Sequence, residues 1–188
     1  MNSTILLFAQ KLDVNVLHYI SNHASPFGVR LAIFVSNIGS PLSFLLITIC
    51  VCLIFWLHKK PYHLLQFLIT LASGSLIVYL IKIFIARPRP VEALIEVSGY
   101  SFPSGHATIA TLFCFLIIFA YKNHIKNQLL KFIFILFFII TALAISFSRI
   151  YLSVHYMSDV VVGIAIGLLI SSISVFIFEN FFGKENLV

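Results

Sequence analysis

The stretch LLQFLITLASGSLIVYLIKIFIA, which runs from Leu64 to Ala86, decides the class of fold. It carries no charge until Lys82, close to its end. A helix that crosses the hydrocarbon core of a bilayer needs about 20 mostly apolar residues, with a range of roughly 17–25. The stretch meets that requirement, so it predicts a membrane-spanning helix.

The composition of the whole 188-residue chain agrees with this prediction. Hydrophobic residues make up 61% and charged residues only 10%, whereas about 25% of a soluble domain is charged. The net charge is +6, but the basic residues are scattered between apolar runs and form no continuous stripe for nucleic acid. The sequence therefore predicts one membrane-embedded domain over residues 1–188, with the bilayer as its environment and no nucleic-acid partner.

Four further apolar segments flank the opening stretch, and together the five predict an all-α bundle of about five membrane spans within residues 40–182. The four lie at about Ser40–Leu57, Gly105–Tyr121, Leu129–Phe147 and Asp159–Phe178. Residues 1–39 mix apolar and polar positions at helical spacing and predict two short interfacial helices. The alternative is that part of Val29–Leu57 forms one long, bent span. Residues 183–188 are expected to be a short mobile tail.

Five spans place the two lysine-containing loops, near Lys59 and Lys126, on the same side as the C-terminus. The loops Arg87–Ser104 and Ser148–Ser158 then lie on the opposite side, with the N-terminus. Each side carries six basic residues, so the positive-inside rule decides the orientation only if one set belongs to a functional site. If it does, the lysine loops are cytoplasmic, and the site of this cell-membrane protein faces the periplasm or the outside. The sequence indicates no oligomeric state.

The first polar motif is KIFIARPRP, in which Lys82 and Arg89 approach the same membrane surface. Pro88 is expected to end the helix, so Arg89 lies on the loop beyond it. Basic residues near a helix end commonly reach toward lipid headgroups. We interpret Arg87 in that way, because no further feature of the sequence favours a role for it.

The second motif is PSGH, from Pro103 to His106. Ser104 before a long apolar run is a typical N-cap, and the first N–H groups of a helix are unsatisfied and attract anions. Gly105 leaves room for a ligand to approach that backbone, and His106 follows in the first turn. Taken alone, the motif would also fit a capped turn with an interfacial histidine.

The third motif is SRIYLSVHYMSD, from Ser148 to Asp159. Arg149 is a permanently charged donor that suits phosphate. His155 and Asp159 are four residues apart and would be neighbours on a helix. A carboxylate bonded to one imidazole nitrogen fixes the tautomer and leaves the other nitrogen available as a base or a nucleophile. An interfacial ion pair is the alternative for this pair alone.

Together, the three motifs indicate a phosphate site on one side of the membrane. Ionisable residues beside spans are costly and usually functional, and three cations with helix N–H groups suit a compact, multiply charged anion. Two histidines suggest that one attacks and the other donates a proton. The motifs hold no cluster of carboxylates and histidines, so no metal site and no cofactor is predicted.

The order and spacing of these motifs resemble the type-2 phosphatidic acid phosphatases, which are related to the vanadium haloperoxidases. The resemblance implies that His155 is the nucleophile and forms a phosphohistidine, that Asp159 orients it, and that His106 protonates the leaving group. It also implies that the remaining motif residues bind phosphate. These are Lys82, Arg89, Ser104, Gly105 and Arg149.

The motif chemistry selects phosphate and not the lipid tail. Many larger members have six spans, and short five-span members include bacterial undecaprenyl diphosphate phosphatases. Undecaprenyl diphosphate is therefore the first substrate expected, and the alternatives are phosphatidylglycerophosphate or phosphatidate, and lipid A in a 1-phosphatase. A catalytically inactive lipid-binding or transport protein is the non-enzyme alternative, against which the intact pair of histidines argues.

Overall fold

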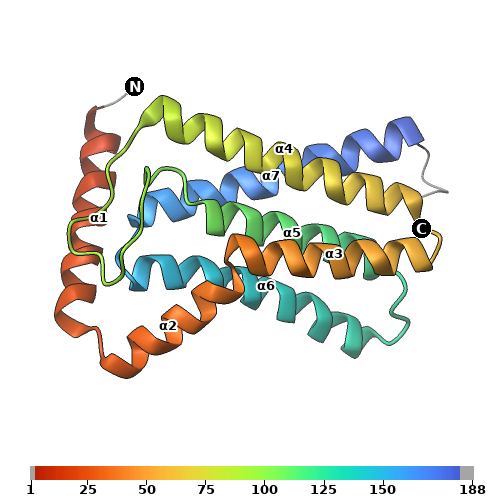
Figure 1. The fold of residues 1–188 in the computed structure, drawn as a ribbon, viewed down its shortest axis with the longest axis horizontal. Helices are drawn as coiled ribbons and strands as arrows, with labels where there is room; N and C mark the ends of the chain where they lie inside the picture. Colours follow the sequence, from red (N-terminus) through yellow and green to blue (C-terminus); the bar gives the residue numbers. More distant parts are fainter. Residues whose placement is uncertain (1–2, 183–188) are drawn as a thin grey trace.

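The computed structural model describes residues 3–182, and these form seven α-helices and no β-strand (Figure 1). The helices are α1 (Ser3–His23), α2 (Pro26–Ile38), α3 (Pro41–Leu57), α4 (Pro61–Ile85), α5 (Gly105–Tyr121), α6 (Gln128–Tyr151) and α7 (Met157–Phe182). The predicted all-α fold is confirmed. The tail predicted at 183–188 lies outside the described residues.

Proline and capping residues explain where several helices begin. Proline opens α2, α3 and α4, a position where its missing N–H would have had no helical partner. Ser25 and Ser40 cap α2 and α3 by accepting from backbone N–H groups, and Asn127 does so for α6. These short side-chain acceptors satisfy donors that the helix itself leaves free.

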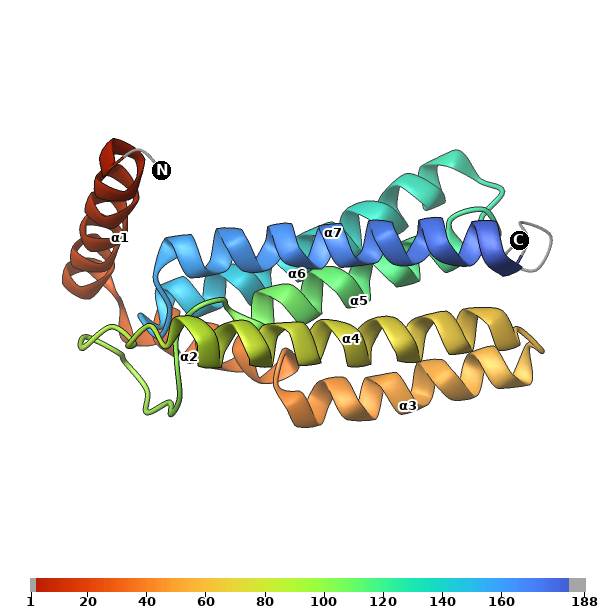
Figure 2. The same cartoon turned by 90° about the horizontal axis from the view of Figure 1, so that it is seen from above.

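Helix α5 lies inside the bundle, in contact with α4, α6 and α7 (Figures 1 and 2). Its buried residues include Leu112 and Phe113. Phe113 packs against Phe44 of α3 and Phe67 of α4, with ring centroids 5.5 and 5.2 Å apart. Because α5 is surrounded, its first turn is fixed relative to the ends of the neighbouring helices.

Two glycines allow α7 to approach α5 closely. A Cβ atom at Gly163 would lie 2.8 Å from the carbonyl oxygen of Ser104, and one at Gly167 would lie 2.7 Å from that of Thr108. The four-residue spacing places both glycines on one face of α7, an arrangement common where membrane helices pack backbone to backbone. The contact holds the beginning of α7 beside the beginning of α5.

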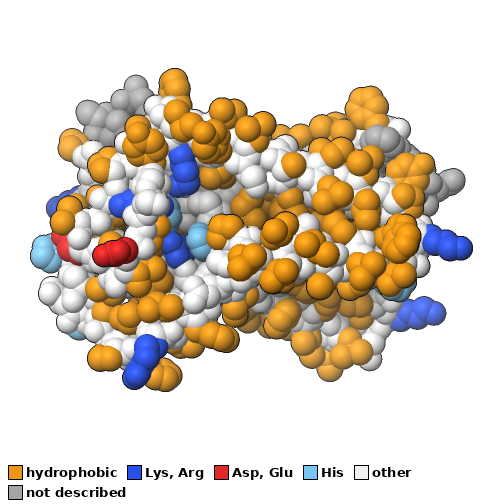
Figure 3. All heavy atoms as spheres, in the orientation of Figure 1, with side chains coloured by type: hydrophobic (Ala, Val, Ile, Leu, Met, Phe, Trp, Pro, Cys, Tyr) orange, Lys and Arg blue, Asp and Glu red, His pale blue; other side chains and the backbone are white. Residues whose placement is uncertain are grey.

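All five predicted apolar segments are helical, and three helices are individually long and apolar enough to cross a membrane: α4, α6 and α7. Helices α3 and α5 have 17 residues each, the short limit for a span. The outer surface of the bundle is rich in exposed apolar side chains (Figure 3). Exposure of this kind is expected where lipid, not water, is the solvent.

The N-terminal region forms two helices before α3, and their interfacial position stays a prediction. Helix α1 has 21 residues and lies across one end of the bundle (Figure 2). Helices α2 and α3 meet at a bend of 44° and together pass the length and hydropathy test for one broken span. This fits the alternative in which part of Val29–Leu57 forms one long, bent span, and it fits a re-entrant loop equally well.

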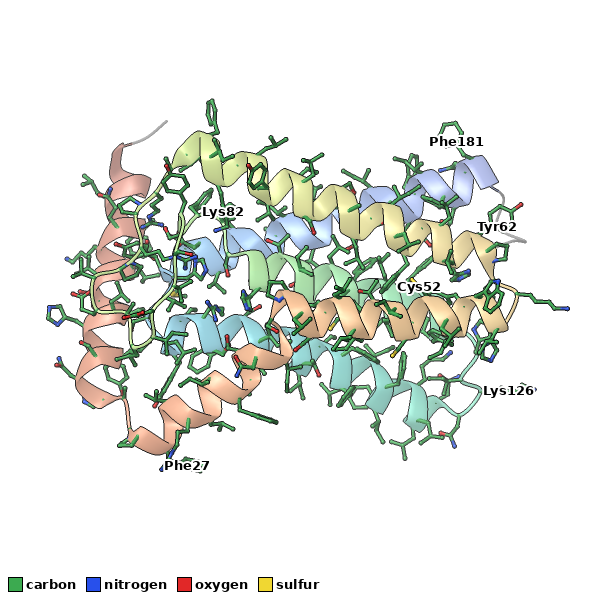
Figure 4. All side chains as sticks on the ribbon, viewed as in Figure 1. Phe27, Cys52, Tyr62, Lys82, Lys126 and Phe181 are labelled. Atoms are coloured by element: carbon green, nitrogen blue, oxygen red, sulfur yellow. The ribbon has the colours of Figure 1, made fainter. Side chains whose placement is uncertain are left out.

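The loops separate by type at the two ends of the bundle, as predicted. Lys126 lies at one end, with the α3–α4 turn and the C-terminal end of α7 (Figure 4). Lys82 lies toward the other end, which carries α1 and the connections 86–104 and 152–156. All three polar motifs therefore meet at one end of the bundle.

Candidate active site

The first motif is held by the loop that follows α4. The helix ends at Ile85, and Ala86 takes a left-handed conformation at its C-cap. Lys82 Nζ donates to the carbonyl oxygens of Tyr100 (2.7 Å) and Ser101 (3.2 Å). Arg89 Nη1 donates to the carbonyl oxygen of Val154 at 2.8 Å. The two predicted cations therefore fold the loop back over the ends of the helices.

The second motif forms the predicted helix start. Ser104 caps α5 by accepting from Ala107 N–H, and its own N–H donates to the carbonyl oxygen of Asp159 at 3.0 Å. A Cβ atom at Gly105 would meet only Val78 Cγ1, at 3.7 Å. The space beside Gly105 is thus open, as a site for an approaching ligand requires.

The third motif places His155 beside Asp159. The His155 side chain is only 2% exposed, and its Nδ1 lies 3.4 Å from Asp159 Oδ2, longer than an ordinary hydrogen bond. The same Oδ2 accepts from Tyr156 N–H at 3.0 Å. His155 lies in the turn before α7 and Asp159 in its first turn, so the pair is not formed on one continuous helix.

The neighbours of His155 indicate which ring nitrogen is free. Arg89 Nη1 lies 3.3 Å from His155 Nε2, and a guanidinium can only donate. Nε2 therefore accepts and carries no proton, which leaves the proton on Nδ1, facing the Asp159 carboxylate. This is the tautomer in which Nε2 can attack an electrophile.

Burial lowers the pKa of His155 to about 4, because a charged imidazolium loses its hydration inside the protein. The Asp159 carboxylate opposes this shift, and the charges of Arg89, Lys82 and Arg149 add to it. His155 is consequently neutral at pH 7.

His106 and Arg149 complete the set of predicted residues. The His106 ring packs against Gly39, where an added Cβ would lie 3.3 Å from His106 Cδ2, and it is within electrostatic reach of Arg149, His155, Arg89 and Lys82. Arg149 is 4% exposed; its Nη1 donates to Ser36 Oγ, and its Nε is buried without a partner. Figure 3 shows basic and histidine side chains gathered in a hollow on this side of the molecule.

The interpretation of Arg87 as a headgroup-seeking residue is wrong. Its Nη1 lies 2.6 Å from Asp159 Oδ1, and its Nη2 lies 2.9 Å from Asp13 Oδ2. Burial lowers the pKa of Arg87, but the two carboxylates outweigh it and raise the pKa overall. Sequence reasoning missed Asp13 altogether. The sequence did hold one signal: Asp13 lies at helical spacing from Leu17 and Ile20, so it is an isolated acid on the apolar face of α1.

The site carries four cations and two carboxylates, which leaves an excess of two positive charges. Arg87 pairs with both carboxylates, whereas Lys82, Arg89 and Arg149 form no ion pair of their own among the described salt bridges. This arrangement, with the first turn of α5, suits a multiply charged anion.

A cavity of about 480 Å³ opens beside His106. Gly105 and His106 line one part of it, and apolar residues of α3, α4 and α5 line the rest. They include Phe44, Leu45, Leu68, Leu71 and Ile109. Among the described residues, no group of three or more histidines, cysteines or acids is arranged to hold a metal ion. That the site works without a metal stays a prediction.

Residues 63–182 match the family model of the PAP2 superfamily. The chain therefore belongs to the PAP2 superfamily. All three motifs lie inside the matched region, which confirms the resemblance drawn from their spacing. As a PAP2 member with several apolar spans, the chain is a multi-pass membrane protein. Asp13 and the whole of α1 lie outside the matched residues.

One curated relative of this PAP2 chain is phosphatidylglycerophosphatase B of Bacillus subtilis, 32% identical over 116 residues. The match covers 60% of this chain and 57% of the relative, so the chain matches little more than half of that protein's length.

Two solved structures share the fold. A transmembrane PAP2-type phosphatidylglycerolphosphate phosphatase from Bacillus subtilis gives a TM-score of 0.85 at 22% identity, covering 96% of this chain and 89% of that one. LpxE of Aquifex aeolicus gives 0.69 at 22% identity, covering 87% and 94%. The likeness to the first of these structures extends over almost the whole chain.

Proposed function

We propose that this PAP2 protein is a membrane lipid phosphatase that works through a phosphohistidine. The observation that carries the proposal is the position of His155, whose Nε2 lies 3.3 Å from Arg89 Nη1 in a site with two positive charges in excess. A nucleophile next to a site for a multiply charged anion suits phosphoryl transfer.

In the first step, the lone pair of His155 Nε2 forms a bond to phosphorus as the bond from phosphorus to the lipid oxygen breaks. The leaving oxygen takes a proton from His106, whose protonated form the bound phosphate favours. Lys82, Arg89 and Arg149 stabilise the charge on the phosphoryl oxygens, and Ser104 and Gly105 present the first turn of α5 to it. Asp159 stabilises the proton on Nδ1.

In the second step, water attacks the phosphorus of the phosphohistidine. His106 accepts the proton of that water, the bond from nitrogen to phosphorus breaks, and its electron pair returns to Nε2. Inorganic phosphate leaves, and both histidines regain their starting states. The reaction draws on positioning and electrostatic stabilisation, and no step assigns a role to a metal ion.

The apolar cavity supports a lipid as the substrate. It continues from His106 along α3 and α4, toward the part of the bundle that faces hydrocarbon. A lipid whose phosphate lies at the histidines can therefore place its tail in this apolar cavity. A soluble phosphate ester, which has no tail, would leave the cavity unfilled.

Phosphatidylglycerophosphate is the substrate that we propose. It was an alternative from the sequence, and the relative that is 32% identical is named for activity on it. Undecaprenyl diphosphate, the first expectation, is supported less, since it rested on the small size of the chain and an outward-facing site. The outward orientation is itself part of the proposal, supported by the lysine loops at the opposite end of the bundle.

A phosphate-release panel with the purified protein in lipid nanodiscs tests these statements. We expect the highest kcat/KM with phosphatidylglycerophosphate, and lower values with phosphatidate, undecaprenyl diphosphate and lipid A. His155→Ala is the matched control and should release no phosphate. Fastest turnover of undecaprenyl diphosphate would overturn the substrate, and no release from any lipid would favour an inactive lipid-binding protein. We expect full activity in EDTA. If EDTA abolished the activity and a divalent metal restored it, the metal-free mechanism would be overturned.

A further inference from the structure

Asp13 is a buried carboxylate on a helix that supplies none of the motif residues. Its side chain is 3% exposed, and it accepts three hydrogen bonds: from Ser158 N–H at 2.8 Å, from Ser158 Oγ at 2.6 Å and from Arg87 Nη2 at 2.9 Å. Ser158 lies in the first turn of α7. Asp13 therefore satisfies a free N–H of that turn from another helix, where a negative charge is favourable.

Arg87 connects Asp13 to Asp159. One guanidinium nitrogen binds Asp13, while the other donates to Asp159 Oδ1 at 2.6 Å and to Ser158 Oγ at 2.8 Å. The guanidinium also lies over the Tyr156 ring, 3.9 Å from its centroid. Asp159 thus has Oδ1 bound to Arg87, while Oδ2 is left for Tyr156 N–H and His155 Nδ1. The rotation of the carboxylate is fixed by these contacts.

We propose that Asp13 is a positioning residue, which acts through Arg87 and Ser158 to hold Asp159 against His155. The proposal rests on the proposed phosphatase function. It assigns to α1 a role in the reaction, although α1 lies across the end of the bundle (Figure 1) and outside the residues that match the PAP2 family model.

The charges explain why Asp13 is needed in addition to Asp159. Without Asp13, the half-buried charge of Arg87 would be balanced by Asp159 alone. The Asp159 carboxylate would then be drawn toward Arg87 and would interact less with His155. With Asp13 present, Arg87 is shared between two acids, and Asp159 keeps one oxygen for the histidine.

The test compares Asp13→Asn with Asn15→Ala, a change on the exposed face of the same helix. Losing the outer partner of a metal-binding histidine typically costs about 10- to 100-fold, and we take that size as the guide for a histidine held through a carboxylate. We expect kcat of Asp13→Asn to fall by that factor, with KM changed less than about threefold and the unfolding temperature in detergent retained. Asn15→Ala should match the wild type in all three. Arg87→Lys, which keeps the charge but loses the fork that joins two acids, should also lower kcat and serves if Asp13→Asn does not fold.

The pH profile separates positioning from a merely structural role. His155 is faced by Arg89, Lys82, Arg149 and Asp159. Asp13→Asn removes a negative charge beside Arg87, which should lower the pKa of His155 and move the acid limb of kcat/KM to lower pH. Arg87→Gln removes a positive charge, which should raise that pKa and move the acid limb to higher pH. Unchanged kcat in Asp13→Asn, or limbs that do not move in opposite directions, would overturn the proposal. Failure of the proposed function is distinct, because the wild type itself would then release no phosphate.

Discussion

At the scale of single residues, the proposed role of His155 as the nucleophile depends on which of its ring nitrogens carries the proton. Arg89 binds Nε2 as a donor, and Asp159 faces Nδ1. Two separate segments of the chain, the loop after α4 and the start of α7, thus specify one tautomer. An imidazole held in this way needs no reorientation before it attacks, which lowers the entropic part of the barrier.

Asp159→Asn is expected to lower kcat by about 10³- to 10⁴-fold, the size of effect seen when a triad carboxylate becomes an amide. The amide can present its NH₂ group to Nδ1, which favours the wrong tautomer, and it loses the charge that stabilises the phosphorylated imidazole. Steady-state phosphate release in nanodiscs measures this. A variant that keeps the wild-type kcat would show that Asp159 has no part in the reaction.

The titration of His155 should lie well below that of a free histidine, whose pKa is about 6.5. Its pKa of about 4 follows mainly from burial. Since the neutral form is the nucleophile, activity should persist as the pH falls and be lost only as the pH drops through the folded-state value. NMR of ¹⁵N-labelled histidine, assigned with His155→Ala, measures it directly. An imidazolium at pH 6 would contradict the account.

The sequence predicted the motif residues because polar residues are unusual beside apolar spans and because their order and spacing resemble those of a known family. It did not reveal Arg87 or Asp13 as partners, since 74 residues separate them and the pairing depends on how α1 docks. A carboxylate on an amphipathic helix looks the same in sequence whether it faces water or a buried arginine.

At the scale of helices, the approach of α7 to α5 decides whether Asp159 and His106 share one site. Helix α5 begins at Gly105 as predicted, because its N-cap is readable in the sequence. Helix α6 extends to Tyr151, beyond the predicted Phe147, since Arg149 is buried by protein instead of marking a helix end. The break between α2 and α3 was harder to place, because Gly39 is accommodated by contacts with Ile145 and His106 that are distant in sequence.

Gly163→Ala is expected to lower the free energy of unfolding by about 1–3 kcal/mol, the usual cost of forcing an extra carbon into a packed interface. The new Cβ would lie 2.8 Å from the Ser104 carbonyl oxygen, so α7 must move from α5 and kcat should fall as well. Thermal unfolding in detergent and phosphate release measure the two effects. Ala165→Val, on the exposed face of α7, is the matched control, and equal behaviour of both variants would contradict the close packing.

At the scale of the whole molecule, the separation of lysine loops from the histidine site gives the protein a direction in the bilayer. The sequence predicted which loops share an end, because alternating spans fix this. It did not decide which end of the bundle faces the cytoplasm, since the two ends carry equal numbers of basic residues. In the structure, Arg87, Arg89 and Arg149 make contacts within the site. The lysine loops are then the set of basic residues to which the positive-inside rule applies.

A cysteine introduced at Lys126, after replacement of the three native cysteines, should be labelled by a membrane-impermeant maleimide only in broken cells. A cysteine at Glu96, in the exposed loop on the site end, should be labelled in intact cells. The positive-inside rule is the physical reason for both expectations. The reverse pattern would invert the proposed orientation without affecting the chemistry.

The central claim is that His155 becomes phosphorylated, and a trapping experiment tests it most directly. The protein in nanodiscs is mixed with lipid labelled with ³²P in the phosphate, quenched within one turnover in alkali, where phosphohistidine survives, and digested for peptide mapping. In the wild type, we predict label on the peptide that contains His155. In His106→Ala, given a substrate whose leaving group needs no proton, the label should last longer. His155→Ala should carry no label. Label on His106 instead, or rapid phosphate release with no labelled protein, would contradict the account.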